Sequence, residues 1–142
     1  MATTTITDRC RQRWLAGNVF NMSSDTIKMA LFNGSSHDAD TASYSTTAEA
    51  TAGSGYNAGG INMAGIAQAL NGTEHVAYLD WETDPSWTTA SITATDCLIY
   101  NSTASNDSMY VGDFSGSKSS SSGTFLVVLP TPAYNTAIIR IA

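Results

Sequence analysis

Charged residues, cysteines and prolines are all scarce in this chain of 142 residues. Lys, Arg, Asp and Glu make up 13% of it, about half the usual share, which excludes a coiled coil, a long-helix protein and a charge-driven disordered tail. No apolar run approaches the roughly 18 residues of a membrane-spanning helix, so we expect no membrane partner. The two cysteines, Cys10 and Cys97, lie far apart without a dense cysteine pattern, which indicates free thiols rather than a disulfide framework.

Hydroxyl groups supply much of the polarity that charge usually provides, because the chain contains 19 Thr and 18 Ser. Such a composition is typical of a β-rich protein. The net charge is −6, yet the positive charge is concentrated: Arg9, Arg11 and Arg13 are three of the six basic residues. The remainder of the chain is strongly acidic and repels phosphate, so we expect no nucleic-acid-binding groove.

Residues 9–16 contain no Gly or Pro and are predicted to form one short helix, with Asp8 as its N-cap and Gly17 as its stop. Beyond it, apolar residues alternate with polar ones or form short runs between turn signals. The pattern predicts seven or eight strands, at 26–32, 61–70, 76–81, 91–100, 109–114, 124–129 and 137–141, with a further short one around 47–50. Residues 1–24 are therefore interpreted as an N-terminal arm with a short helix, and residues 25–142 as an antiparallel β-sandwich or jelly roll.

Four segments of this sandwich are less regular than the rest. Residues 35–60 are polar and predict a long loop. Residues 61–70 also suit a helix by the spacing of their apolar residues, although the surrounding strands favour β structure. Residues 116–123 are rich in Gly and Ser and predict a flexible loop, whereas residues 124–129 are apolar on both faces and predict a central, buried strand.

A possible cation site lies near the first histidine. His37, Asp38 and Asp40 are close together in the sequence. A calcium loop needs further oxygen ligands at alternating positions, and Ala42 and Tyr44 occupy those places. A solvated loop explains these residues better, and we predict no metal site.

An acidic run is the other candidate for chemistry. Asp80, Glu82 and Asp84 alternate as if on one strand face, and Trp81 and Trp87 are near enough to provide an apolar wall that raises a carboxyl pKa. An acidic strand edge that discourages aggregation explains the same pattern. We therefore predict no catalytic residue here and no enzymatic activity.

The string GSGYNAGG at 53–60 loosely matches a dinucleotide-binding pattern. That pattern requires an apolar strand before it and a helix after it, and neither is present in the sequence. The glycines instead predict a sharp chain reversal, with Gly55, Tyr56, Gly59 and Gly60 as structural turn residues and no cofactor.

The basic helix that ends at Gly17 is followed, in order, by DTIKMALF, YSTTAEATAGSGYNAGG, WTTASITA, LIYN, VGDF with Lys118, and AIIRI. Taken together in this order, these segments resemble a family of small structural proteins encoded among the virion genes of tailed bacteriophages and prophages. The likeness spans nearly the whole chain, and GSGYNAGG and AIIRIA are its most specific parts. The chain departs from the family after the double glycine, where it has INMAGIAQAL instead of the usual Leu or Val.

This resemblance implies a β-sandwich component of the virion that decorates or cements the capsid exterior. The implied partners are the major capsid protein and further copies of the chain itself. We expect Arg9, Arg11 and Arg13 to reach an acidic patch on a neighbouring coat subunit, with Trp14 and Phe20 as apolar anchors. Removal of the N-terminal arm is expected to abolish particle binding while leaving the domain folded.

Three alternatives stay open at this point. Trp14 could cap the core of its own sandwich instead of a partner surface. The chain could be a tail- or fibre-associated adhesion module, in which the 35–60 loop and Trp81 or Trp87 stack on host-surface carbohydrate. An acid–base or metal-assisted hydrolase is the third.

Overall fold

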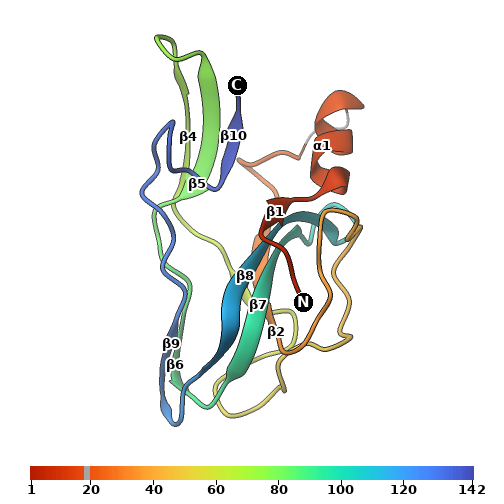
Figure 1. Cartoon of the computed structure of the whole chain (residues 1–142), viewed down its shortest axis with the longest axis vertical. Helices are drawn as coiled ribbons and strands as arrows, with labels where there is room; N and C mark the ends of the chain where they lie inside the picture. Colours follow the sequence, from red (N-terminus) through yellow and green to blue (C-terminus); the bar gives the residue numbers. More distant parts are fainter. Residues whose placement is uncertain (18–19) are drawn as a thin grey trace.

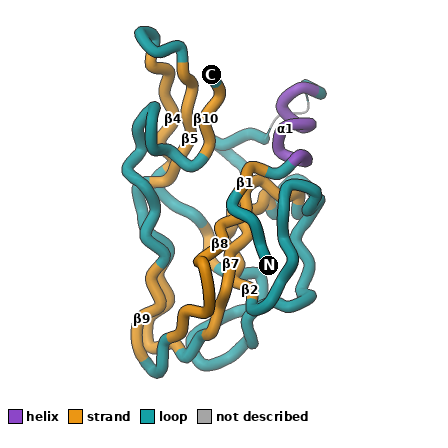
Figure 2. The backbone as a smooth tube through the Cα atoms, viewed as in Figure 1, coloured by secondary structure: helices purple, strands orange, loops and turns teal. Residues whose placement is uncertain are grey.

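A computed structural model describes residues 1–17 and 20–142 and consists mainly of antiparallel strands. The predicted all-β, sandwich-like fold with a short N-terminal helix is confirmed (Figures 1 and 2). The elements in chain order are β1 (Thr5–Ile6), α1 (Asp8–Leu15), β2 (Ile27–Phe32), β3 (Ile61–Asn62), β4 (Ile66–Asn71), β5 (Val76–Trp81), β6 (Ser86–Ala90), β7 (Thr93–Asn101), β8 (Asp107–Ser119), β9 (Gly123–Leu126) and β10 (Ile139–Ile141).

The largest sheet has five antiparallel strands in the order β1–β8–β7–β2–β3. Its strands β2 and β7 are buried over most of their length. Successive side chains of β2 point to opposite faces, so Met29 and Leu31 enter a large core on one face while Phe32 joins a smaller cluster with Leu98 on the other. Burying an apolar side chain of this size is worth about 1.5–3 kcal/mol.

Aromatic side chains close the larger core opposite this sheet. Trp87 lies between Tyr56 and Phe125, with ring centroids 6.0 and 6.2 Å away, and Phe125 lies 6.3 Å from Phe114. Trp81 is also buried, with 1% of its surface exposed. The core therefore holds together β8 of the large sheet, the β6–β9 pair and the loop that carries Tyr56.

Two smaller sheets lie along one side of the molecule. β4, β5 and β10 form a three-stranded sheet that stands apart at one end of the long axis, whereas β6 and β9 pair near the other end (Figure 1). The segments that connect them run side by side: Val127 N donates to Pro85 O at 3.0 Å, and Leu129 N donates to Asp84 Oδ1 at 2.8 Å. The two small sheets thus belong to one continuous double ribbon.

Most predicted elements agree with the structure. The strand predictions at 26–32 and 76–81 correspond to β2 and β5, and the helix begins one residue earlier than expected because Thr7 rather than Asp8 is its N-cap. Residues 61–70 form the short β3 and then all of β4 except its last residue, Asn71, with Gly65 at φ +73° between the two strands. Around 47–50 there is only an isolated bridge between Phe32 and Glu49.

The region from β6 to β9 differs most from the prediction. β6 was not expected from the sequence. Its pairing register with β9 shifts between Trp87 and Ala90, where Thr89 has φ +51°, so its apolar residues do not alternate regularly with polar ones. The loop predicted over 116–123 is wrong in its first half, since Lys118 and Ser119 pair with Ala94 and Thr93 of β7 and extend β8.

The strand predicted over 124–129 is neither central nor fully buried. β9 ends at Leu126 and pairs only with β6, which leaves Leu126 51% and Val128 72% exposed. The prediction failed because a strand that is apolar on both faces is usually covered on both faces and paired on both edges, whereas here the face of β9 that carries Leu126 is exposed and, among the described strands, only β6 pairs with β9.

Candidate functional site

Helix α1 is fixed to the β-structure at its first turn. Thr7 Oγ1 accepts the Cys10 N–H at 3.3 Å and donates to Ser108 O at 3.0 Å, so the N-cap joins the helix to β8. Asp8 N also donates to Ala39 O at 2.8 Å. The Cys10 side chain is fully buried, and burial raises the pKa of its thiol to about 12. The helix therefore presents one fixed face to solvent.

The three predicted arginines do not point the same way. Arg9 and Arg13 both pair with the nearly buried carboxylate of Asp107 in β8, the Arg9 Nε lying 3.5 Å from Asp107 Oδ1. Arg11 pairs with the exposed Asp8 on the outer face of the helix. Two of the three guanidinium groups thus hold the helix on its own domain, and Arg11 remains at the surface.

The two predicted aromatic anchors lie inward of Arg11. Trp14 is half-buried and packs against the larger core, and Phe20 is 4% exposed within that core. Instead, the apolar side chain on the outer face is Leu15, which is 91% exposed and lies four residues after Arg11. Sequence reasoning missed Leu15, although its i, i+4 spacing from Arg11 places the two on one helix face.

The glycine-rich segment forms the tight reversal that its sequence predicts. Gly53 and Tyr56 exchange two backbone hydrogen bonds, of 2.8 and 3.1 Å. Gly55, Gly59 and Gly60 all have φ between +73° and +88°, a region that favours glycine. At Gly60 a Cβ atom would lie 1.8 Å from Met29 O, so this position accepts no side chain.

Glu49 holds the 35–60 loop through three donors. Its carboxylate accepts the Tyr44 hydroxyl at 2.7 Å, the Tyr56 hydroxyl at 2.8 Å and the Gly59 N–H at 2.6 Å. Burial raises the pKa of Tyr56, and the nearby Glu49 raises it further against the opposing Leu31 N–H bond, so the hydroxyl stays a donor. The long loop is therefore tied to the sheet.

A second polar cluster joins Ser35, His37 and Asp96. The Nδ1 atom of His37 lies 2.9 Å from Ser35 Oγ and 3.0 Å from Asp96 Oδ2, and Thr95 Oγ1 donates to Asp96 Oδ1 at 2.8 Å. In a catalytic triad the serine and the carboxylate bind opposite nitrogens of the imidazole. Here both contact Nδ1, so the cluster secures the start of the loop on β7.

Two carboxylates of the acidic run, Asp80 and Asp84, accept hydrogen bonds from the backbone of the C-terminal segment. Asp80 is buried and accepts the N–H groups of Trp81 at 2.8 Å and Ile138 at 3.1 Å, and burial raises the pKa of its carboxyl. Asp84 accepts the N–H of Leu129, while Glu82 is exposed. In the described part of the chain, no group of three or more His, Cys, Asp or Glu side chains could hold a metal ion.

The two tryptophans considered for carbohydrate stacking lie in the core. Trp81 is 1% and Trp87 6% exposed, so neither offers a ring face to a sugar. Among residues 1–17 and 20–142, no atom accepts a hydrogen bond from the Nε1 atom of Trp81.

Comparison with known proteins finds no matching family model, no matching curated protein and no matching solved structure. No helix among residues 1–17 and 20–142 has the length and apolar character to cross a membrane.

Proposed function

We propose that this chain is a non-enzymatic structural component of a tailed-phage virion that decorates or cements the capsid exterior by binding the major capsid protein. The sequence resemblance supplies the class of protein. The structural observation that carries the proposal is the outer face of α1, where Arg11 and Leu15 are displayed together on a fixed helix.

The helix is well suited to a contact surface because it loses little freedom on binding. The N-cap bonds of Thr7 and the pairing of Arg9 and Arg13 with Asp107 already fix its position. A preorganised surface avoids part of the entropy loss of association. The N-terminal segment therefore offers a partner a rigid patch, formed by Arg11 and Leu15, rather than a free arm.

The patch fits a coat-protein surface with a carboxylate beside an apolar depression. Arg11 exchanges its pairing with Asp8 for a carboxylate of the partner, which its guanidinium binds with two parallel hydrogen bonds. Leu15 removes its exposed side chain from water in the same contact. A capsid lattice presents many copies of this contact, so a modest affinity at each is enough when the decorating copies also touch one another.

The test is binding to capsids prepared without this chain. Arg11→Glu and Leu15→Asp are each expected to weaken binding tenfold or more, as expected for a contact residue near the centre of an interface. Arg140→Glu makes the same charge change on an exposed arginine of β10 and is expected to leave binding unchanged. Circular dichroism checks that all three variants are folded.

The copy number in purified virions separates the proposal from a tail location. A capsid protein occurs in a fixed ratio to the coat lattice, whereas a tail protein occurs in few copies. A tail-like copy number, or full binding by both α1 variants, would overturn the proposal.

A further inference from the structure

The β4–β5–β10 sheet leaves apolar side chains uncovered at its tip. One face of this sheet is buried at its base, where Trp81 and Ile139 enter the larger core. Further out on the same face, Leu70 is 70% and Ile141 52% exposed, and both lie opposite Ala77 in the register. The apolar face therefore extends beyond the core, and at the tip of the sheet the described residues leave it exposed to solvent.

The outer edge of β4 is also open. Glu82 N donates to Gly65 O at 2.7 Å, and in an antiparallel ladder this bond directs the backbone groups of Ile66, Gln68 and Leu70 away from β5. β4 is the last strand of its sheet and carries no Lys, Pro or bulge that would protect an edge. Such an edge is a template for pairing with another strand.

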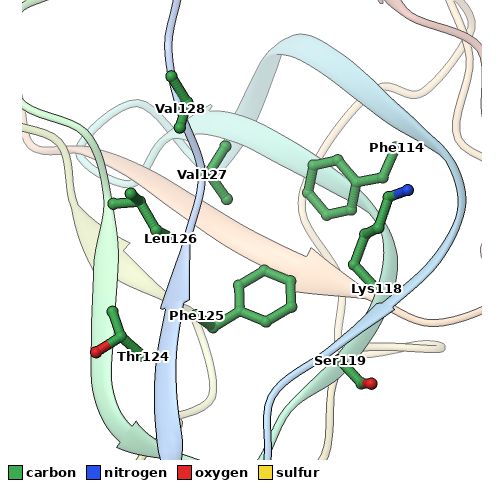
Figure 3. Close-up of a pocket in the computed structure, with 8 residues that line it drawn as sticks. All are labelled: Phe114, Lys118, Ser119, Thr124, Phe125, Leu126, Val127 and Val128. Atoms are coloured by element: carbon green, nitrogen blue, oxygen red, sulfur yellow. The ribbon is translucent and has the colours of Figure 1, made fainter.

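An open apolar groove lies between β8 and β9. Its volume is about 510 Å³, and Figure 3 shows the rings of Phe114 and Phe125 with Val127 inside it and Lys118 beside them. Because Val127 N bonds to Pro85 O, the backbone groups of Leu126 point away from β6. The groove thus combines an apolar floor, an open strand edge and one cation.

We propose that the groove between β8 and β9 receives the β4–β5 hairpin of a second copy, with β4 adding to the free edge of β9. The lengths agree: the six residues of β4 extend about 20 Å and residues 124–128 about 17 Å, at roughly 3.3 Å per residue. Leu70 then packs against the exposed Leu126 and Val128.

Charge favours this pairing over contact between two hairpins. The turn between β4 and β5 carries the exposed Glu74, and Lys118 is the only charged residue lining the groove. Two identical hairpins that paired edge to edge would run antiparallel, with their two Glu74 residues at opposite ends of the contact, and would leave the groove and Lys118 without a partner. Insertion of the hairpin into the groove places unlike charges together and covers both apolar surfaces.

The two surfaces lie towards opposite ends of the long axis, which makes the contact head-to-tail (Figure 1). A heterologous contact of this kind builds a ring if the rotation closes and an open chain if it does not. The inference is independent of capsid binding, because it concerns the free protein.

The experiment mixes two variants, Leu70→Asp and Val128→Asp. Both side chains are largely exposed, so neither change removes a core contact. Each variant alone is expected to be at least tenfold weaker in self-association than the unaltered chain in sedimentation velocity. The Leu70→Asp chain keeps an intact groove and the Val128→Asp chain an intact hairpin, so an equimolar mixture is expected to form one-to-one dimers and nothing larger.

Ala52→Asp adds the same charge at an exposed loop position and is expected to associate like the unaltered chain. As a second measurement, Glu74→Lys and Lys118→Glu each weaken association, and the double variant restores it. The proposal is overturned if the unaltered chain stays monomeric at all concentrations. It is also overturned if Val128→Asp alone still dimerises, since that result indicates hairpin-to-hairpin contact.

Discussion

Asp96 is a carboxylate with no exposed surface, and its own neighbours supply its hydrogen bonds. Ser35, Thr95 and His37 all contact its oxygens. Burial alone raises the pKa of a carboxyl, but at Asp96 the bonds from His37, Ser35 and Thr95 outweigh burial and hold the pKa below its usual value. The ionised form of Asp96 therefore stabilises the folded state.

We predict that Asp96→Asn lowers the free energy of unfolding by about 1–3 kcal/mol at neutral pH, because several buried donors lose a charged acceptor. A depressed folded-state pKa contributes stability above the unfolded pKa of about 3.9, and this contribution is lost as the pH falls through the folded value. The difference between the two proteins in urea unfolding should therefore shrink in acid.

Glu82→Gln provides the control for this measurement, because Glu82 is an exposed carboxylate. Its free energy of unfolding is expected to stay within about 0.5 kcal/mol of the unaltered protein. If Asp96→Asn lowers the free energy of unfolding by the same amount at neutral and at acid pH, the charge of Asp96 does not have the role assigned to it.

At the scale of elements, the 35–60 loop depends on one acceptor. Glu49 collects the hydroxyls of Tyr44 and Tyr56 and the N–H of Gly59, and Tyr100 of β7 donates to Gly59 O at 2.8 Å. The rings of Tyr44 and Tyr100 also stack, with centroids 4.5 Å apart. A loop without regular strands is thereby held against the large sheet.

We predict that Glu49→Ala increases amide hydrogen exchange across residues 44–60 and lowers the free energy of unfolding by about 2 kcal/mol, because the buried Tyr56 hydroxyl loses its acceptor. Exchange in β7 should change less, since its ladder to β2 does not involve Glu49. Glu82→Ala serves as the control. Unchanged exchange in the loop would show that the glycine turns alone maintain it.

The elements that sequence patterns predict well are strands with regular alternation or a short apolar run between turn signals. β2 follows period two, β5 is a short apolar run, and both lie where expected. β6 and β9 were missed or misplaced because a bulge and an uncovered edge decide their environment, and neither leaves a local signal.

The candidate site was predictable only in part for a similar reason. Three arginines within five consecutive positions indicated a partner-binding N-terminal segment. Two of them, however, pair with Asp107, nearly a hundred residues further along the chain. Only the fold could show that Arg9 and Arg13 face inward. Leu15 could have been found by helical spacing from Arg11 once the helix was assigned.

At the scale of the whole molecule, the N-terminal residues belong to the body of the fold. β1 pairs with β8, Ala2 and Cys10 are buried, and Thr3 N donates to His37 O at 2.9 Å. We therefore expect the domain to lose stability when its N-terminal arm is removed, in contrast to the expectation from the sequence.

We predict that deleting residues 1–17 lowers the midpoint of thermal unfolding by about 10 °C or more, since it uncovers the core and leaves Asp107 without a cation. Differential scanning calorimetry measures the shift, and Arg11→Glu, which changes only the surface of the helix, should unfold near the temperature of the unaltered protein. An unshifted midpoint in the truncated chain would mean that the helix adds nothing to the stability of the sheet.

The double ribbon that joins the two small sheets has a mechanical consequence. β5 continues into β6 and β9 continues into β10, so a pull on the hairpin tip travels along covalent backbone past the side of the large sheet (Figure 2). We expect the paired strands Ser86–Ala90 and Gly123–Leu126 to share this load, because β6 continues into β7 and β9 follows directly from β8, so that both are anchored in the large sheet. The ribbon would then transmit tension from the hairpin tip to the most deeply buried strands of the molecule.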